Sequence, residues 1–247
     1  MANKTGIVSI SFRKHSPEEI LAAAKAAGLD AVEWGGDVHV PHGDTEIAGR
    51  VKSLTEEMGL EIAEYGSYYA IATSEPELFG EVLKSAKALG TDVIRVWPMK
   101  VPSDTVTHEA YALAVADAKR ICREAGNITV ALECHPKTLT DEYHTALKFI
   151  KDVDMPNLKM FWQPNQHRPQ DYNTDSIKAL LPYIVAVHVF SWDREVHMPL
   201  VDGEGAWREY ISLLGEKDLY YMLEFMHDNE ISTLMETAKT LHGWLDN

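Results

Sequence analysis

A join of a helical segment, a glycine and a short apolar run occurs four times and restricts the fold of this chain more than any other feature. Glycine suits the left-handed position just past a helix end, where other residues are strained. The runs that follow are rich in Val, Ile and Leu, as expected of strands covered on both faces. The joins are AAGLDAVEW, EEMGLEIAEYG, KALGTDVIRVW and REAGNITVALE, around Gly28, Gly59, Gly90 and Gly126.

Similar units continue to the end of the chain, so that eight predicted strands alternate with eight predicted helices. GIVSISF is the predicted first strand, and LKMFW, IVAVHVF and LYYMLEF are the last three. Ser16 before Pro17 predicts an N-cap followed by a proline in the first helical turn. The predicted helices cover residues 17–27, 45–58, 76–89, 107–125, 141–153, 174–181, 207–214 and 232–245.

Strict βα alternation is typical of a closed barrel or of a doubly wound open sheet. An open sheet that binds dinucleotides carries a glycine-rich loop after its first strand. Here the first strand continues into SFRKHSPEE, which has no glycine. Eight units in 247 residues favour the α/β class and a single (βα)8 TIM barrel domain over residues 1–247.

The chain is acidic, because 38 Asp and Glu residues against 23 Lys and Arg residues give a formal charge of −15. This charge repels nucleic-acid phosphates and anionic membrane surfaces, so neither is expected as a partner. No segment approaches the ~18 consecutive apolar residues of a membrane span. The N-terminus lacks the basic start and apolar run of a signal peptide, so the expected location is cytoplasmic.

Acids, histidines and aromatics stand at the ends of the predicted strands, where a βα barrel assembles its active site. Glu133, His188 and Glu224 each follow an apolar run in a different late unit. Two unpartnered carboxylates buried together would cost several kcal/mol or become protonated. A divalent cation removes that cost, and the donor set suits Mn²⁺, Mg²⁺, Co²⁺ or Zn²⁺. Separate buried ion pairs with Arg95 or Lys137 are the alternative.

Six stretches carry a resemblance that spans nearly the whole chain: GLDAVEWGGDVHVPHGD, LGTDVIRVWP, VALECHPKTLTD, AVHVF, VDGEGAW and YMLEF. In their order and spacing the chain resembles the xylose isomerase-like, endonuclease IV-like barrels. That family includes ketose 3-epimerases, hydroxypyruvate isomerases and inosose dehydratases. The resemblance implies a TIM barrel, a small-molecule sugar or keto-polyol substrate, and assembly into homo-oligomers, either dimers or tetramers.

The resemblance also implies a metal held by an acid on strand five, an aspartate on strand six, a histidine on strand seven and a glutamate on strand eight. Glu133, His188 and Glu224 match three of these positions, and Mn²⁺ is the first expectation for the ion. Gln163 stands where the family usually has aspartate. Its amide oxygen can ligate a hard cation without bringing charge. Alternatively, Gln163 only holds a water molecule and the site is partly disabled.

Further residues near these positions are predicted to contact the substrate. The family usually has a histidine three residues after its aspartate, whereas His167 comes one residue later here and either touches substrate hydroxyls or caps its loop. His135, two residues past Glu133, is the better candidate. Packing or a solvated loop is the alternative for the others, which are Trp34, Tyr65, Tyr68, Trp97 and Trp192 as walls, His39 after strand two, and Arg194 and His197 after strand seven.

The prediction that follows is a divalent-metal-dependent isomerase or epimerase of a sugar or keto-polyol. Glu133 and Glu224 are the predicted acid–base pair, in which one removes the proton beside the carbonyl and the other returns it. The enediolate formed between these steps is stabilised by the cation. Loss of a β-hydroxyl instead would make the chain a lyase of the inosose-dehydratase kind. A non-catalytic sugar-binding barrel is a further alternative.

Overall fold

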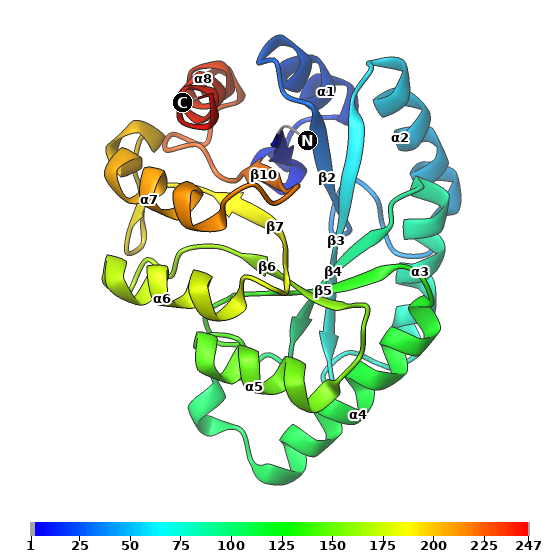
Figure 1. Cartoon of the computed structure of the whole chain (residues 1–247). Helices are drawn as coiled ribbons and strands as arrows, with labels where there is room; N and C mark the ends of the chain where they lie inside the picture. Colours follow the sequence, from blue (N-terminus) through cyan, green and yellow to red (C-terminus); the bar gives the residue numbers. More distant parts are fainter. Residues whose placement is uncertain (1–2, 247) are drawn as a thin grey trace.

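Eight parallel strands close into a barrel in the computed structural model, which describes residues 3–246 (Figure 1). Neighbouring strands follow the chain order from β1 to β7, and β10 closes the ring between β7 and β1. The predicted (βα)8 TIM barrel is therefore confirmed. The strands are β1 (Lys4–Val8), β2 (Ala31–Gly35), β3 (Glu61–Ile71), β4 (Val93–Pro98), β5 (Thr129–Glu133), β6 (Leu158–Trp162), β7 (Ile184–Val189) and β10 (Tyr220–Leu223).

Helices form an outer layer around the barrel, with one α-helix after each barrel strand (Figure 1). The outer layer also closes, because α8 packs against both α7 and α1. A short hairpin of β8 (Trp192–Asp193) and β9 (Val196–His197) lies between β7 and α7. The helices are α1 (Pro17–Ala26), α2 (Thr45–Glu57), α3 (Leu78–Leu89), α4 (His108–Ala125), α5 (Tyr143–Val153), α6 (Gln170–Leu180), α7 (Glu204–Leu214) and α8 (Leu234–Leu245).

All four glycine joins have the positive φ that the sequence predicts, but Gly126, with a ψ of −112°, lies outside the left-handed helical region. Gly28, Gly59, Gly90 and Gly126 have φ angles of 72°, 73°, 84° and 64°. At Gly90 the amide donates to the carbonyl of Ala86 at 2.9 Å, which ends α3 in a left-handed turn. Each join therefore reverses the chain from a helix of the outer layer into the next strand of the barrel.

The first strand is shorter than predicted. It ends at Val8, and Ser9–Phe12 form the 3₁₀ helix η1 instead of extending the strand. The Ser9 hydroxyl accepts the amide of Gly35 at 2.9 Å. A side chain thus supplies the acceptor beyond the point where the backbone ladder stops. The expectation that Phe12 stands at a strand end is wrong for this reason.

Helix starts follow the sequence prediction only where a capping signal exists. The Ser16 cap is confirmed, because its hydroxyl accepts the Glu19 amide at 3.3 Å and the Glu19 carboxylate accepts the Ser16 amide at 2.8 Å. In contrast, α6 begins at Gln170, four residues before its predicted start, and α7 begins at Glu204, three residues before. Neither helix has a side-chain cap hydrogen bond that could mark its start.

The inside of the barrel changes from apolar to polar toward the carboxyl ends of its strands. Three interior side chains pack together as a small apolar cluster. Two residues further along each of these strands stands a polar residue, and alternate residues of a strand point to the same side. The alternation therefore directs the polar side chains toward the barrel axis. The pairs are Ala131 with Glu133, Phe161 with Gln163, and Ala186 with His188.

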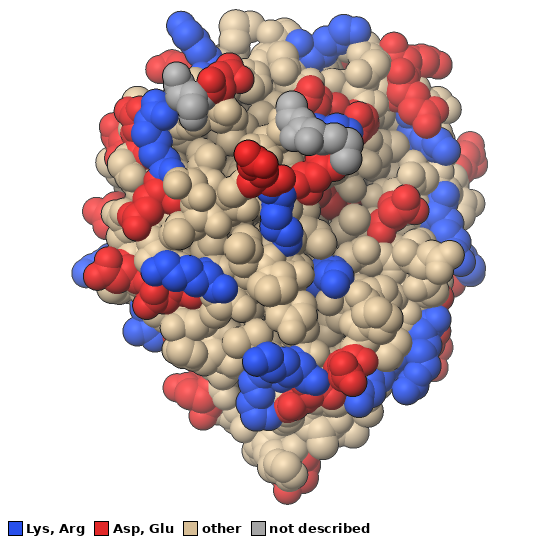
Figure 2. All heavy atoms as spheres, viewed as in Figure 1, with Lys and Arg blue, Asp and Glu red and all other residues tan. Residues whose placement is uncertain are grey.

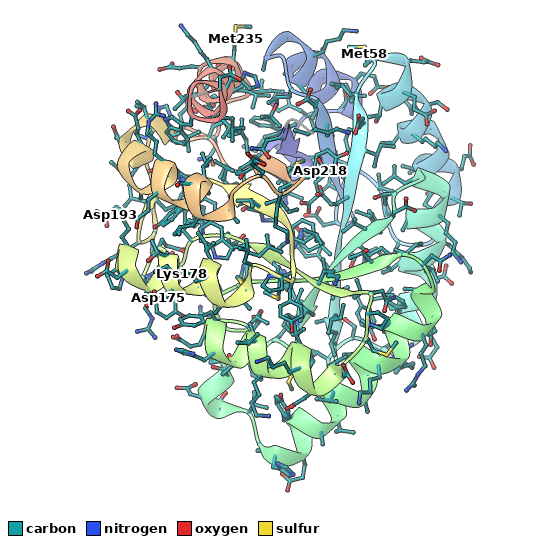
Figure 3. All side chains as sticks on the ribbon, in the orientation of Figure 1. Met58, Asp175, Lys178, Asp193, Asp218 and Met235 are labelled. Atoms are coloured by element: carbon teal, nitrogen blue, oxygen red, sulfur yellow. The ribbon has the colours of Figure 1, made fainter. Side chains whose placement is uncertain are left out.

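The outer surface mixes charges of both signs. Basic and acidic side chains lie interspersed on the face that Figure 2 presents. On α6, Asp175 and Lys178 project outward (Figure 3) and pair at 3.1 Å. Exposed pairs of this kind contribute roughly 0–1 kcal/mol each. Within residues 3–246, no helix is long and apolar enough to cross a bilayer.

Replacing Gly59 by alanine should destabilise the protein by about 1 kcal/mol, because a β-carbon is strained at its φ of 73°. None of the described atoms lies within 4 Å of the added carbon, so the cost is conformational. Gly49→Ala is the matched control, since Gly49 lies inside α2 with similarly open space. Alanine there should stabilise by about 0.5–1 kcal/mol. Urea denaturation measures both, and equal effects would contradict the role of the joins.

Candidate metal centre and active site

Three side chains that can ligate a metal meet at the carboxyl end of the barrel. Glu133 ends β5, His188 lies in β7 and Glu224 directly follows β10. One ligand atom from each lies within 4.8 Å of the other two. The Nδ1 atom of His188 is 3.8 Å from Glu133 Oε1 and 3.6 Å from Glu224 Oε2. The structure therefore brings together the three ionisable groups that the sequence analysis selected.

Gln163, the residue after β6, adds a fourth donor to this group. Its Oε1 atom is 2.9 Å from Nδ1 of His188. Atoms bound to one divalent cation at about 2.0–2.3 Å lie roughly 3–4 Å from one another, which matches these separations. Two carboxylates, a neutral imidazole and an amide oxygen also suit the chemistry of a divalent cation. The residues present therefore fit such an ion.

A carboxylate inside the barrel fixes the ring of His188 from behind. Glu33 Oε2 is 2.9 Å from His188 Nε2, and neither side chain is exposed. A carboxylate that accepts the Nε2 proton directs Nδ1 toward the other donors and selects the tautomer that can bind a metal. The sequence analysis assigned Glu33 no role. Its signal was an acid within the apolar run AVEW.

Arg95 connects this carboxylate to one of the proposed ligands. Its Nε donates to Glu33 Oε1 at 2.9 Å, and its Nη1 donates to Glu133 Oε2. The indole of Trp97 donates to the same Glu133 oxygen. An ion pair between Arg95 and a candidate ligand, the alternative weighed from the sequence, therefore exists. It engages Oε2 of Glu133, whereas Oε1 is the atom near His188.

The two carboxylates at the centre have different surroundings. Glu133 is anchored by Arg95 and Trp97, whereas the Glu224 side chain has no hydrogen bond among the described residues. Burial disfavours the charged form of Glu133, but Arg95 and His188 outweigh it and lower its pKa. Burial raises the pKa of Glu224 to about 7, opposed by His188 and reinforced by Glu133. A carboxyl that titrates near 7 can take up and release a proton at neutral pH.

The imidazole of His188 balances these acids. Burial disfavours its charged form, but Glu224 and Glu33 outweigh that effect and raise the pKa of His188 to about 9. The imidazolium then donates from Nε2 to Glu33 and from Nδ1 to Gln163. A cation at the centre would replace the Nδ1 proton, so metal binding and proton release are coupled here.

A second buried acid stands beside Glu33 on the neighbouring strand. Glu64 pairs with Glu33 in the register of β3 and β2. Burial raises the pKa of Glu64 well above its usual range, and the charge of Glu33 adds to the shift. A β-carbon at Gly66 would lie 2.4 Å from Glu33 Oε1 and 2.7 Å from Arg95 Nη2. Only glycine at that position leaves room for the buried ion pair.

A cavity of about 400 Å³ opens beside these donors. It is bordered by three of the four donors and by predicted substrate contacts Trp97, His135 and His167. The rings of Trp97 and His135 lie 4.8 Å apart and tilt by 31°. Tyr68 and Trp192, predicted as walls, border the cavity as well. The structure therefore brings these five side chains to the candidate site.

Two of the predicted wall residues lie outside this cavity. Trp34 is fully buried and donates from its indole to Thr55 Oγ1 of α2 at 3.2 Å. Because consecutive side chains of a strand alternate, Glu33 points into the barrel and Trp34 points toward the helices. Tyr65 is buried as well, and its hydroxyl donates to the carbonyl of Val40 at 2.7 Å.

Three predicted polar contacts, His39, Arg194 and His197, also lie outside this cavity; His197 stacks on Trp192 at 4.3 Å. His39 is buried, with its ring nitrogens 3.1 Å from Ser9 Oγ and 3.2 Å from the His15 carbonyl, so it ties the first two loops together. Arg194 is exposed at the tip of the β8–β9 hairpin, with a φ of 54°. Its neighbour Asp193 stands at the outer edge of the molecule in Figure 3. Neither His39 nor Arg194 borders the 400 Å³ cavity.

Two cationic residues that border the cavity were not predicted as substrate contacts. The guanidinium of Arg13 donates to Asp37 at 2.7 Å and to the hydroxyl of Tyr68 at 2.8 Å. Lys137 has no hydrogen bond or ion pair with the described residues. Its φ of 62° is uncommon for a residue with a side chain, and such strain clusters at functional sites. A negative group on a substrate would meet compensating charge here.

Comparison with known proteins shows a family and several relatives. Residues 21–247 match the family described as the xylose isomerase-like TIM barrel. A 3-dehydroshikimate dehydratase from Bacillus anthracis is similar to the chain at 25% identity, over 96% of each sequence. The expected resemblance to this family is thereby confirmed, and relatives of the chain include enzymes.

Solved structures share the barrel. A probable 3-DHS dehydratase from Bacillus anthracis has a TM-score of 0.83 at 24% identity, covering 96% of this chain and 98% of that one. A D-psicose 3-epimerase from Clostridium cellulolyticum H10 has a TM-score of 0.68 at 14% identity, covering 98% and 97%. A xylose isomerase-like barrel from Mycobacterium smegmatis, in complex with magnesium, has a TM-score of 0.73 at 14% identity, covering 99% and 98%. These likenesses establish a common fold.

Glu33→Gln should weaken Mn²⁺ binding by about 10–100-fold, because the carboxylate that orients the His188 ring is lost. Glu64→Gln is the matched control, since it replaces a second buried acid, on the neighbouring strand, with an isosteric amide. Isothermal titration calorimetry with Mn²⁺ compares the two variants with the wild-type protein. Equal affinities for the two variants would contradict the role of Glu33.

Without metal, the protein should become less stable as the pH rises toward about 9. The stabilising contribution of Glu224 is complete below 4.5 and is lost as the pH rises through about 7. That of His188 is complete below 6.5 and is lost through about 9. Mn²⁺ should reverse this trend, because the ion binds the deprotonated groups. Melting temperatures measured across this pH range, with EDTA and with Mn²⁺, test both pH trends. A stabilisation by Mn²⁺ that does not grow with pH would refute the coupling between metal binding and proton release.

Proposed function

Because the chain belongs to the xylose isomerase-like TIM barrel family, we propose that it is a divalent-metal-dependent enzyme acting on a small hydroxylated ketone. The favoured reaction is a dehydration. A proton leaves the carbon beside the carbonyl, and a hydroxyl leaves the next carbon as water. The whole barrel acts as one domain in this proposal.

The observation that carries the proposal is the asymmetric pair of carboxylates that faces one imidazole at the cavity. Glu133 is fixed by Arg95 and Trp97, whereas Glu224 has no hydrogen bond within residues 3–246 and its pKa is about 7. Both carboxylates border a cavity of about 400 Å³, a size suited to a small-molecule substrate. One carboxylate held by hydrogen bonds and one without any, at a single point, are an arrangement for proton transfer.

Each residue of the centre has a distinct role in this proposal. Glu133, Gln163, His188 and Glu224 hold the cation, for which the oxygen-rich set favours Mn²⁺ or Mg²⁺. When bound, the ion polarises the ketone and stabilises the negative charge that develops on its oxygen. Glu224 removes the proton beside the carbonyl and can transfer it to the departing hydroxyl. Arg95 keeps the charge of Glu133 in place while this happens.

Two findings favour dehydration of an acidic substrate over isomerisation of a neutral sugar. The dehydratase relative aligns over 96% of both sequences at 25% identity, whereas the epimerase shares the fold at 14% identity. Lys137 borders the cavity with no acidic partner among the described residues and can compensate a carboxylate, whereas Arg13 is already paired with Asp37. A cyclic keto acid such as 3-dehydroshikimate therefore represents the proposed substrate class.

Isomerisation or epimerisation, the leading prediction from the sequence, is the second candidate. Glu133 lies on the same centre as Glu224 and could return the proton to the substrate. Return to the opposite face of the same carbon gives an epimer, and return to the adjacent carbon gives an isomer. The two candidates share every residue role up to that return step.

Glu224→Gln should abolish proton transfer, lowering the rate by about 10²–10⁴-fold while the fold is retained. The assay follows 3-dehydroshikimate and a panel of ketoses by NMR in deuterated water with Mn²⁺. Exchange of the proton beside the carbonyl reports proton removal, and loss of ring hydroxyl signals reports dehydration. Glu195→Gln is the control, since Glu195 borders the same cavity with an 81% exposed side chain.

The assay also separates the competing functions. Exchange with dehydration supports the proposed lyase, and exchange with a rearranged sugar supports the isomerase or epimerase. Absence of exchange for every compound, with Mn²⁺ bound, would contradict both reactions and favour a non-catalytic sugar-binding barrel.

A further inference from the structure

A second cavity opens at the same end of the barrel, beside the one that contains the candidate site. It has a volume of about 360 Å³ and lies between the segment from β6 to α6 and the segment from β7 to α7. Gln166, Phe190 and Trp192 border both cavities. We call these three side chains the partition, because they lie between the two cavities. An elongated molecule that extends past the partition would occupy both cavities.

The second cavity has a rigid aromatic wall. Trp207 and Tyr210 are buried on α7, and their rings pack at 5.5 Å from each other. The indole of Trp207 donates to the carbonyl of Phe190 at 2.8 Å, which fixes the partition to the wall. These buried rings give the wall its rigidity, and the partly exposed ring of Trp192 is the aromatic face that a ligand ring can pack against.

Polar groups at the second cavity are available to a ligand. Among residues 3–246, the side chains of Gln166, Ser191 and Asp202 have no hydrogen-bond partner, and all three border this cavity. An amide, a hydroxyl and a carboxylate together can donate to and accept from ligand hydroxyls. Two carboxylates, Asp193 and Asp202, border the cavity. Arg168, which also borders it, is paired with Glu142, so the lining disfavours an anionic ligand.

The partition itself carries an unsatisfied donor. The indole N–H of Trp192 is buried and has no acceptor among the described residues, while its ring stacks on His197 at 4.3 Å. A buried donor without an acceptor costs about 1–3 kcal/mol. An oxygen atom of a molecule that passes the partition would supply the acceptor.

We propose that the second cavity is a subsite for an uncharged hydroxylated ring, linked to the ketone that reacts in the first cavity. The position of the reacting ketone in this inference rests on the proposed function. The position of the linked ring rests on the second cavity alone. Each cavity lies within the range of about 300–1,000 Å³ that a small ligand occupies. The ketone that reacts lies at the donors of the first cavity, and a ring linked to it would occupy the second. The substrate class is therefore a small hydroxylated ketone, as in the proposed function, that also carries a glycosidically linked sugar.

The test compares one ketose with the same ketose bearing a glucose. The probes are fructose and its glucosides turanose, leucrose and isomaltulose, which differ in the hydroxyl that carries the glucose. Titration calorimetry in the presence of Mn²⁺ should show at least one glucoside binding about tenfold or more tightly than fructose. Equal or weaker binding of all three glucosides would overturn the proposal.

Variants test whether the tighter binding of a glucoside, relative to fructose, arises in the second cavity. Ala206 on α7 borders only the second of these two cavities, so Ala206→Phe fills it and should remove the glucoside advantage while fructose affinity stays unchanged. Ala206→Ser is the size-matched control and should retain the advantage. Asp202→Asn tests the polar lining of the second cavity at an exposed position, so it does not disturb the core. It should reduce the affinity advantage of the glucosides over fructose. An advantage that survives both Ala206→Phe and Asp202→Asn would place the second ring elsewhere and overturn the subsite.

Failure of this inference can be told from failure of the proposed function. Glu224→Gln removes proton exchange but leaves the glucoside advantage, because Glu224 does not border the second cavity. Proton exchange with no glucoside advantage contradicts only the subsite. A glucoside advantage that disappears with Ala206→Phe, in a protein without proton exchange, supports the subsite and contradicts only the reaction.

Discussion

The candidate centre depends on the buried hydrogen bond between Glu33 and His188. This bond, 2.9 Å long inside the barrel, decides which ring nitrogen faces the other donors. With Nε2 held from behind, Nδ1 lies 2.9–3.8 Å from an amide oxygen and two carboxylate oxygens on three other strands. A rotated or differently protonated ring would leave those three oxygens without a nitrogen beside them. The donor set therefore depends on the hydrogen bond between Glu33 and His188, which lies deeper in the barrel than the donors do.

Burying so many charges requires compensation inside the barrel itself. Arg95 contacts Glu33 and Glu133 together, so one guanidinium holds both the carboxylate that orients the imidazole and a proposed ligand. At Glu64, burial and the charge of Glu33 raise the pKa, which favours the uncharged form of this acid. Gly66 gives this cluster its space. The same electrostatics give the two carboxylates of the centre different pKa values. The pKa of Glu133 is lowered, whereas the pKa of Glu224 is raised to about 7.

The sequence predicts the barrel and the donors Glu133, His188 and Glu224 from local patterns, whereas Gln163 is expected as a donor only through the family resemblance. Glycine after each helix and an apolar run after each glycine specify alternation, and polar residues after apolar runs specify strand ends. The depth at which a side chain lies within the barrel is harder to predict from the sequence, since it depends on the register between strands. Glu33 and Trp34 are adjacent, yet a shift in the β2–β3 register at Glu33 and the alternation of side chains put one at the axis and the other under α2. Loop residues such as His39 and Arg194 could not be placed, because no periodic pattern fixes the direction of a loop side chain.

The central claim is that Gln163 completes a four-donor centre with Glu133, His188 and Glu224. A crystal structure of the protein grown with Mn²⁺, with anomalous diffraction collected at the manganese edge, tests it most directly. The account predicts a single strong anomalous peak within about 2.0–2.4 Å of His188 Nδ1, Gln163 Oε1 and an oxygen of each glutamate. A peak that excludes Gln163, or the absence of a peak between the two glutamates, would contradict it.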